Sequence, residues 1–401
     1  MVTNTSSNQI LKYTLEDFNR LLENEPCPCA VLDLEAFDHN LGLFEKGLEG
    51  TSKTMRIGTK SLRVPALIDR CLKRPGIKGV FVYHPNEIAY LHDQYGIDDF
   101  IVAYPIAGKQ EAETCIAAVK SDPGIKLAMV VDAIEHLQLL QVAATAADVE
   151  IGVIVDVDMG INFMGVHAGV LRTPLREPGE VVAFAKRIKE FDRLSFKGIL
   201  GYEGQEAGIR EDSFIMRRMK KASRPVVIAR RAAVVTSLES EGFHCEIVNA
   251  GGSGSFRDNL KEACVTEIAA GSGLFKPHSF DPFKNLEDYW PAMFMALRVV
   301  RRPSPGVVTA FSGGFVSSGD RLPPKIVLPV GCSARKLEGF GEVQTPVILG
   351  RGTELKIGDI IVCRLAKGGE PLERFTEVLA VSGGEIVARY PTYRGVGVWG
   401  G

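Results

Sequence analysis

Two features of the sequence could do chemistry together: a lysine that ends an apolar, strand-like segment and a glycine-rich loop far downstream. Lys60 directly follows the segment 54–59, and a lysine at the end of a buried strand would be shielded from water. Burial disfavours the ammonium form and leaves a nucleophilic amine suited to Schiff-base chemistry. The alternative is a lysine at the rim of the fold, paired with Asp156 or Asp158.

The glycine-rich loop spans residues 251–255 and follows the apolar segment Cys245–Ala250. Glycines let backbone N–H groups crowd around an anion, and serine hydroxyls add further donors. A shorter glycine-serine pair ends the next strand-like segment, Val265–Gly271. We interpret both as a phosphate site, and a tight packing turn is the alternative. The candidate phosphate ligands are Gly251, Gly252, Ser253, Gly254, Ser255, Gly271 and Ser272.

These two features could hold a phosphorylated aldehyde at both of its ends. Pyridoxal 5'-phosphate has this shape, because its aldehyde carbon reacts with a lysine amine and its phosphate needs N–H donors. The sequence therefore predicts a pyridoxal-phosphate site in which Lys60 binds one end of the cofactor and the loop 251–255 binds the other.

Eight apolar segments, each followed by a stretch with helical spacing, could position these residues. The segment 127–131 is continuously apolar, which indicates burial on both faces, as in a parallel sheet covered by helices. Eight such units predict an α/β fold with a closed (β/α)8 TIM barrel, whose strands would carry the site at their carboxyl ends. An open doubly wound sheet is the alternative, although no Gly-x-Gly-x-x-Gly follows the first strand. The predicted strands are Thr54–Thr59, Gly79–Tyr83, Asp99–Tyr104, Lys126–Asp132, Ile151–Asp158, Phe196–Tyr202, Cys245–Ala250 and Val265–Gly271.

Beyond about residue 290 the chain changes to short β-rich segments separated by glycine and proline. This change predicts a second, all-β domain. An extra apolar segment, 29–34, precedes the barrel, and pairing with the β domain rather than with the barrel is one arrangement for it. The predicted organisation is an N-terminal segment over 1–35, the barrel over 36–285 and the C-terminal β domain over 286–401.

Composition narrows the classes of partner. The chain has 401 residues with 47 basic and 49 acidic side chains, a net charge of −2, which argues against nucleic acid or an anionic membrane as the main partner. No apolar run approaches the roughly 18 residues of a membrane helix, and the first residues lack the features of a secretion signal. The eight cysteines show no zinc or redox spacing, so reduced thiols in a cytoplasmic protein are expected.

Several segments resemble fold-type III pyridoxal-phosphate enzymes, the group that includes proteins with an alanine racemase N-terminal domain, D-threonine aldolases and D-serine dehydratases. The resemblance runs along nearly the whole chain, and it is closest to the subgroup of amino acid deaminase/aldolase proteins. Its motifs are specific for fold and cofactor and weak for substrate. The matching segments are Pro26–Asn40, Arg56–Ser61, Gly201–Gln205, Gly251–Ser255 and Thr266–Ser272, and those that resemble the subgroup are 202–208, 341–346 and 391–395.

The resemblance implies that Lys60 forms the Schiff base and transfers protons, that Tyr202 lies beside the cofactor, and that residues 252–255 bind its phosphate. It implies a barrel with a C-terminal β domain, and a homodimer in which the partner's β domain completes each active site. The implied activity is that of a lyase on D-3-hydroxy amino acids, acting through an external aldimine by aldol cleavage or dehydrative deamination. The alternatives are an amino-acid racemase, with Tyr202 or a β-domain residue of the partner as second base, and a pyridoxal-phosphate-binding protein without turnover.

The stretch 158–166 departs from the motif of the group at the fifth strand, because it lacks the arginine that the motif contains. In the group this arginine faces the pyridine nitrogen of the cofactor. Arg172 or Asn162 could take its place, and an Arg172 that faces solvent is the alternative.

A second departure concerns metal. Aldolases and dehydratases of the group bind a divalent cation through a histidine and an acidic or thiol ligand in the β domain. The corresponding stretch here, 364–370, contains no histidine, and the last histidine of the chain is His278. The sequence therefore predicts no metal ligands. Lys367, held by Glu370, could supply the positive charge as a catalytic residue, and a surface ion pair of these two side chains is the alternative.

Overall fold

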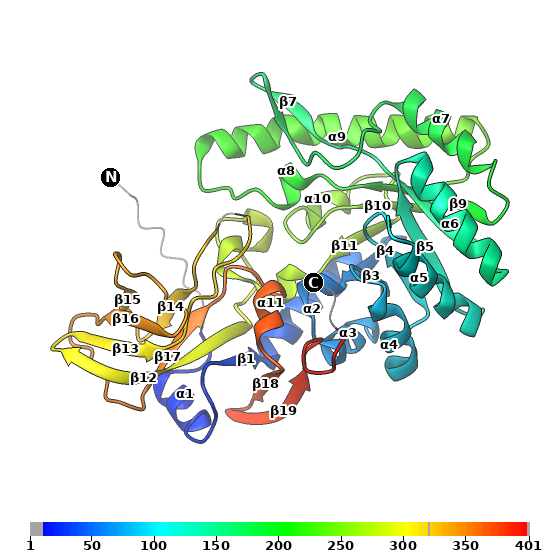
Figure 1. The fold of residues 1–401 in the computed structure, drawn as a ribbon. Coiled ribbons are helices and arrows are strands. Elements are labelled where there is room, and N and C mark those ends of the chain that lie inside the picture. The colour runs from blue at the N-terminus through cyan, green and yellow to red at the C-terminus, as the bar shows by residue number, and fades with distance from the viewer. Residues whose placement is uncertain (1–10, 320, 399–401) are drawn as a thin grey trace.

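The computed structural model, drawn in Figure 1, describes residues 11–319 and 321–398. Eight parallel strands in it close into a barrel in the order β10-β11-β2-β3-β4-β5-β6-β9. This confirms the predicted (β/α)8 barrel and excludes the open doubly wound sheet, because a closed sheet has no edge strand. The strands are β2 (Thr54–Gly58), β3 (Ile77–Val82), β4 (Asp99–Val102), β5 (Lys126–Val131), β6 (Ile151–Asp156), β9 (Leu194–Gly201), β10 (Ile247–Ala250) and β11 (Glu267–Ala270).

Helices and short turns follow the barrel strands and cover the outside of the barrel. Most strands end one or two residues before the predicted position, so Lys60, Tyr104 and Tyr202 lie on the loops at the carboxyl ends. The α-helices are α2 (Leu34–Leu48), α3 (Pro65–Leu72), α4 (Asn86–Tyr95), α5 (Lys109–Ser121), α6 (Ile134–Ala147), α7 (Pro178–Ile188), α8 (Gly204–Ala207), α9 (Phe214–Ser240), α10 (Phe256–Asn259) and α11 (Ser272–Phe275). Three 3-10 turns, η1 (Thr59–Ser61), η2 (His278–Phe280) and η3 (Lys284–Leu286), and a hairpin of β7 (Ile161–Phe163) and β8 (Val166–Ala168) complete this part.

The inside of the barrel is closed by packed side chains. Ile101, Val130, Ile154 and Leu200 form an apolar cluster of buried residues from the barrel strands. Buried Arg56 pairs with Glu267 at 3.0 Å and also with Asp99 on a third strand. These contacts fill the barrel, so a ligand can enter only at its ends.

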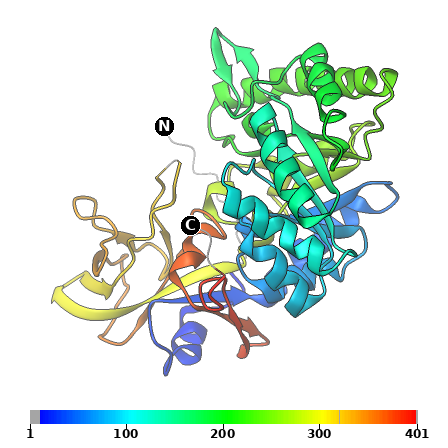
Figure 2. The same ribbon diagram turned by 45° about the vertical axis from the view of Figure 1, so that its right-hand side comes forward.

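The β domain is a sheet in the order β15-β16-β13-β12-β1-β18-β19, in which β17 pairs with β12 and β14. Figure 2, a turned view, keeps these strands on one side of the molecule and the barrel on the other. The strands are β12 (Met293–Ser304), β13 (Val307–Phe311), β14 (Lys325–Leu328), β15 (Ser333–Ala334), β16 (Gln344–Ile348), β17 (Ile360–Arg364), β18 (Glu377–Ser382) and β19 (Glu385–Pro391), with the 3-10 turn η4 (Glu370–Arg374).

The first strand, β1 (Cys29–Asp33), lies inside this C-terminal sheet, antiparallel to β12 and parallel to β18. All five of its residues are buried, as expected for a strand with neighbours on both edges and packed faces. Helix α1 (Leu15–Leu21) precedes it. Asp33 then caps helix α2, because its carboxylate accepts the N–H groups of Glu35 and Ala36. Helix α2 of the barrel part therefore begins at the residue after strand β1 of the β sheet ends.

Candidate active site at the barrel mouth

A cavity of about 1080 Å³ lies at the carboxyl ends of the barrel strands. Loops of the barrel and of the β domain both contribute to its wall. Of the predicted site residues, Gly254 and Ser255 lie outside this wall. Those that line it are Lys60, Tyr202, Gly251, Gly252, Ser253, Gly271, Ser272 and Lys367.

Lys60 is exposed to this cavity rather than buried, so the expected shielding of its amine from water is not observed. Its Nζ lies 5.6 Å from the centre of the Tyr104 ring. Within the described residues it forms no ion pair with Asp156 or Asp158, and Asp158 instead pairs with Arg176 at 3.2 Å. The arrangement therefore leaves the Lys60 amine available to a ligand, unlike the rim pair that was the alternative.

The turn that carries Lys60 is fixed from the side of the β domain. A Cβ atom at Gly369 would lie 2.0 Å from the carbonyl oxygen of Lys60, so only glycine allows this approach. Close by, Arg63 forms an ion pair with Glu373, which also accepts a hydrogen bond from the Tyr83 hydroxyl. The β-domain loop thus holds the lysine turn against the barrel.

Behind this turn lies a buried carboxyl group, Glu87, that joins three segments. One of its oxygens accepts the N–H groups of Tyr83 and His84, and the other accepts the hydroxyl of Tyr393 at 2.7 Å. Burial raises the pKa of Glu87 to about 7, although these hydrogen bonds and that of Thr59 oppose the shift. Tyr393 comes from the last described residues of the chain, so this contact also ties the chain end to the lysine turn.

The raised pKa of Glu87 predicts a pH dependence of stability. The native carboxyl binds its proton more tightly than the unfolded one, whose pKa is about 4.5, so its contribution is present below pH 4.5 and is lost as the pH rises through 7. The loss is on the order of 3 kcal/mol. We expect the melting temperature of Glu87→Gln, relative to wild type, to be several degrees higher at pH 8 than at pH 5. Tyr393→Phe keeps the carboxyl but removes a hydrogen bond that lowers its pKa, so its pH dependence should be at least as steep as that of wild type. A pH profile of Glu87→Gln that runs parallel to that of wild type would contradict the assignment.

The glycine-rich loop directs some of its donors inward and leaves others free. The Ser255 hydroxyl donates to Glu203 at 2.7 Å, and a Cβ at Gly254 would lie 2.4 Å from the carbonyl oxygen of Ala207. These two residues therefore pack behind the loop. The Ser255 hydroxyl was predicted to bind the phosphate, but its bond to Glu203 leaves it no longer free to do so. In the described part of the chain, the N–H groups of Ser253, Gly254 and Ser272 have no hydrogen-bond partner.

These free N–H groups lie close to the lysine turn. The Ser272 hydroxyl donates to Ser61, the neighbour of Lys60, at 3.0 Å. Gly271 allows this contact, because a Cβ there would lie 2.7 Å from that of Ser61. Lys60 and two residues with unpaired N–H groups, Ser253 and Ser272, thus line one cavity, as a phosphorylated aldehyde requires. The residues present fit pyridoxal phosphate.

Tyr202 lies between the loop and Arg172, whose guanidinium is 5.5 Å from the centre of the tyrosine ring. Burial, reinforced by the charge of Glu203, raises the pKa of Tyr202 to about 12. The phenol is therefore protonated at neutral pH and can donate a hydrogen bond. Of the two residues predicted to replace the missing arginine, only Arg172 lines the cavity, since Asn162 lies exposed on the hairpin strand β7.

Three carboxylates, of Asp132, Asp156 and Asp158, line the cavity at β5 and β6. Burial and then the charge of Asp132 raise the pKa of Asp156 to about 7. His136 lies 3.1 Å from Asp132. The sequence placed these aspartates at strand ends but did not single them out, because acidic residues at strand ends are common.

On the β-domain wall of the cavity, Lys367 belongs to a cluster of three polar side chains. Its Nζ donates to the Ser318 hydroxyl at 2.7 Å and lies 3.1 Å from Glu370. The Ser318 hydroxyl in turn donates to Glu370 at 2.9 Å. A hydroxyl group is thus held between an ammonium and a carboxylate. Sequence reasoning missed Ser318, since it lies far from Lys367 along the chain and no motif marks it.

Neither a metal site nor a membrane span emerges from residues 11–319 and 321–398. Among these residues, no group of three or more His, Cys, Asp or Glu side chains is placed to hold a metal ion. Within the same residues, no helix is both long and apolar enough to cross a membrane.

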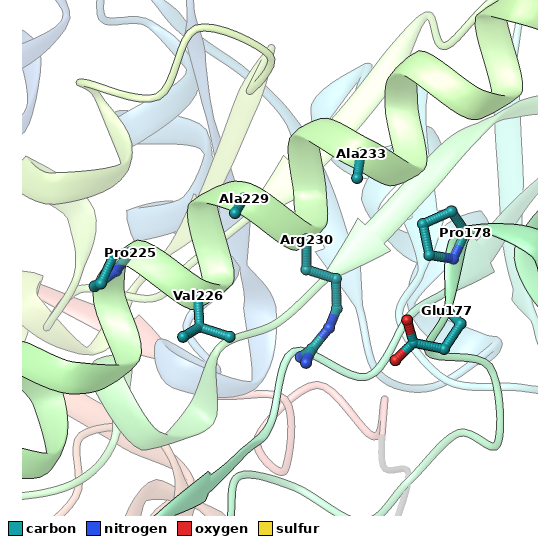
Figure 3. A pocket seen from close by; sticks show the side chains of 7 residues that line it. All are labelled: Glu177, Pro178, Pro225, Val226, Ala229, Arg230 and Ala233. Carbon is teal, nitrogen blue, oxygen red and sulfur yellow. The ribbon is translucent and has the colours of Figure 1, made fainter.

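A second hollow of about 500 Å³ lies on the outside of the barrel, between the start of α7 and the middle of α9 (Figure 3). Pro225, Val226 and Ala229 give it an apolar floor. Arg230 at its edge donates to the carbonyl oxygen of Gly160 at 2.6 Å and so supports the loop after β6. None of the predicted site residues lies in it.

Comparison with known proteins places this site in context. The sequence model of the family 'Alanine racemase, N-terminal domain' matches residues 32–278 of this chain. A 3-hydroxy-D-aspartate aldolase of Paracoccus denitrificans (strain Pd 1222) is 26% identical over 303 residues, 73% of each chain. A D-threonine aldolase of Arthrobacter sp is 25% identical over 304 residues, 75% of this chain and 74% of the relative.

Two solved structures show the same fold. D-threonine aldolase from Filomicrobium marinum has a TM-score of 0.79 at 21% identity, with 93% of this chain and 96% of that chain covered. A cysteine-to-alanine variant of D-threo-3-hydroxyaspartate dehydratase, in its metal-free form, has a TM-score of 0.72 at 16% identity, with 93% and 98% covered.

Proposed function

The chain belongs to the alanine racemase N-terminal domain family, and from that premise we propose that it is a pyridoxal-phosphate-dependent lyase acting on D-3-hydroxy amino acids. The family is pyridoxal-phosphate-dependent, and relatives at about 25% identity are aldolases of such amino acids. The observation that carries the proposal is that one cavity is lined by Lys60, by Ser253 and Ser272 with their unpaired N–H groups, and by the cluster of Lys367, Ser318 and Glu370.

Each group has a role that its surroundings allow. The N–H groups of Ser253, Gly254 and Ser272 would bind the phosphate, and the Lys60 amine would bind the aldehyde carbon. When bound, the cofactor withdraws the electron pair of the bond that breaks at the substrate's α-carbon. The Lys60 amine lies in the open cavity, where it could hold or deliver a proton at the substrate's α-carbon.

The cluster on the β-domain wall would act on the substrate's β-hydroxyl. Burial alone would raise the pKa of Glu370, but hydrogen bonds from Ser318 and Lys367 lower it below its ordinary value, so the carboxylate is charged at neutral pH. In aldol cleavage the β-hydroxyl proton passes to a base, the Cα–Cβ bond breaks, and the α-carbon takes up a proton to give glycine and an aldehyde. Glu370 can accept the first proton while the Lys367 ammonium stabilises the oxygen.

A homodimer is part of this proposal. Large apolar side chains are exposed on the β7–β8 hairpin, on the loop after it and at the start of α9, the exposed fractions running from 58% to 85%. Arg172, which lines the cavity, directly follows the exposed Leu171, so a second copy that covers these side chains would also reach the cavity mouth. The side chains are Met164, Val166, Leu171, Phe214 and Ile215.

The products of the loaded enzyme test this function. We expect a D-3-hydroxy amino acid to be converted either to glycine and an aldehyde, by aldol cleavage, or to an oxo acid and ammonia, by dehydration. The L-enantiomer serves as the control and should react far more slowly. Exchange of the α-hydrogen for deuterium without loss of the amino acid would replace the lyase by a racemase, and complete inertness with cofactor bound would leave a binding protein.

A further inference from the structure

A fully buried carboxylate, Glu203, lies beneath the glycine-rich loop and binds two of its donors and one from helix α10. One oxygen accepts the Ser255 hydroxyl and the Asn259 amide, both at 2.7 Å. The other accepts the Gly251 N–H at 3.2 Å. Glu203 comes directly after Tyr202, so one short segment at the end of β9 contributes both to the cavity wall and to the underside of the loop.

The charge of Glu203 is balanced by an equally buried arginine. Arg231, on helix α9, donates to Glu203 at 2.8 Å and to the carbonyl oxygen of Gly201 at the same distance. Its other terminal nitrogen forms an ion pair with Glu262. A bare carboxylate under an anion site would repel a phosphate, and the paired guanidinium removes much of that repulsion.

This arrangement sorts the donors of the loop into two sets. Gly251, Ser255 and Asn259 point inward to Glu203, and the Gly252 N–H donates to the Ser255 hydroxyl oxygen. Among the residues that the structure describes, none pairs with the N–H groups of Ser253 and Gly254. The inward bonds hold the loop in one conformation, so its free donors need not be ordered when an anion binds. Gly251 has φ +84°, a conformation that this anchoring must maintain.

We propose that Glu203 is a positioning residue that presets the loop for a phosphate group, and that Arg231 keeps its charge compatible with that anion. The proposal rests on the proposed function in one respect, that the ligand carries a phosphate. It predicts that loss of Glu203 lowers the affinity for ligands that carry a phosphate and leaves the affinity for those that lack one little changed. The reason is that the Glu203 carboxylate does not line the cavity and bonds instead to the loop, Asn259 and Arg231.

The test measures the affinity of cofactor-free protein for pyridoxal 5'-phosphate and for pyridoxal, which lacks the phosphate, by absorbance titration. Glu203→Gln should lower the affinity for pyridoxal phosphate by about tenfold or more, because buried donors to the carboxylate lose their acceptor. The affinity for pyridoxal should change by no more than about twofold. Glu262→Gln is the matched control, since it removes an equally buried carboxylate from the same arginine without touching the loop. It should leave the ratio of the two affinities unchanged.

Ser255→Ala is the second variant if Glu203→Gln does not fold, because it removes the bond to Glu203 and the acceptor of the Gly252 N–H but no charge. It should lower the affinity for pyridoxal phosphate about threefold and leave the affinity for pyridoxal unchanged. An unchanged ratio in Glu203→Gln, or in Ser255→Ala where the first variant does not fold, would overturn the proposal. Wild-type protein that binds pyridoxal as tightly as pyridoxal phosphate would instead contradict the phosphate site itself, and with it the proposed function.

Discussion

Lys60→Ala is expected to lose the covalently attached cofactor and to reduce turnover by about 10³-fold or more, since it removes both the nucleophile and a proton-transfer group. In wild type, borohydride reduction followed by peptide mapping should find the cofactor on Lys60. The reason is geometric: Lys60 is exposed to the cavity, within one residue of the Ser61–Ser272 contact that joins it to the loop with free N–H donors.

Lys276 provides an internal control for this experiment. Burial lowers the pKa of its amine to about 8, so reactivity governed by pKa alone would favour it. Its Nζ, however, donates to the carbonyl oxygens of Phe280 and Leu286, and Lys276 does not line the cavity. If peptide mapping found the reduced cofactor on Lys276, or on no lysine, the assignment of the Schiff base to Lys60 would be wrong.

The barrel could be predicted from the sequence because its strands are short, mainly apolar and separated by helical stretches. Each of these signals is local, so eight consecutive ones define the topology without knowledge of long-range contacts. The ends of the strands were less predictable. The chain leaves the ladder at η1 before Lys60, where a 3-10 turn that carries polar residues replaces the expected strand end.

The direction of individual side chains could not be predicted from the loop motif. Ser253 and Ser255 look equivalent in the sequence, yet only Ser253 lines the cavity, because Ser255 is drawn to Glu203 below the loop. The same holds for Lys60, whose expected burial depended on a strand end that the structure replaces by an open turn. Such directions depend on which polar partner lies nearest in the fold.

Partners from the β domain were missed for a different reason. Ser318 contacts Lys367 and Glu370, which lie 49 and 52 residues further along the chain, and Tyr393 contacts Glu87, 306 residues before it. The segment 391–395 resembles the subgroup, but the resemblance assigns no role to Tyr393, and no local pattern marks Ser318.

Lys367→Ala is expected to lower turnover by about 100-fold while the cofactor stays bound, the scale seen when one fixed donor to a developing oxyanion is removed. The ammonium is held by Ser318 and Glu370 on the cavity wall, so it already lies where a substrate hydroxyl could take the place of the serine hydroxyl. The measurement is turnover of a D-3-hydroxy amino acid together with the absorbance of bound cofactor. Added manganese should not raise the activity, and a chelator should leave it intact.

Lys73→Ala is the matched control, because Lys73 also pairs with an acidic residue, Asp69 at 2.6 Å, but on helix α3 and outside the cavity wall. If the Lys367–Glu370 pair were only an exposed ion pair, both variants would behave like wild type, since such pairs contribute little. A loss of turnover in Lys367→Ala but not in Lys73→Ala would assign the effect to the position of Lys367 on the cavity wall. Wild-type activity that disappears with the chelator and returns with the metal would show that the oxygen is stabilised by a cation, and the ammonium would then lose this role.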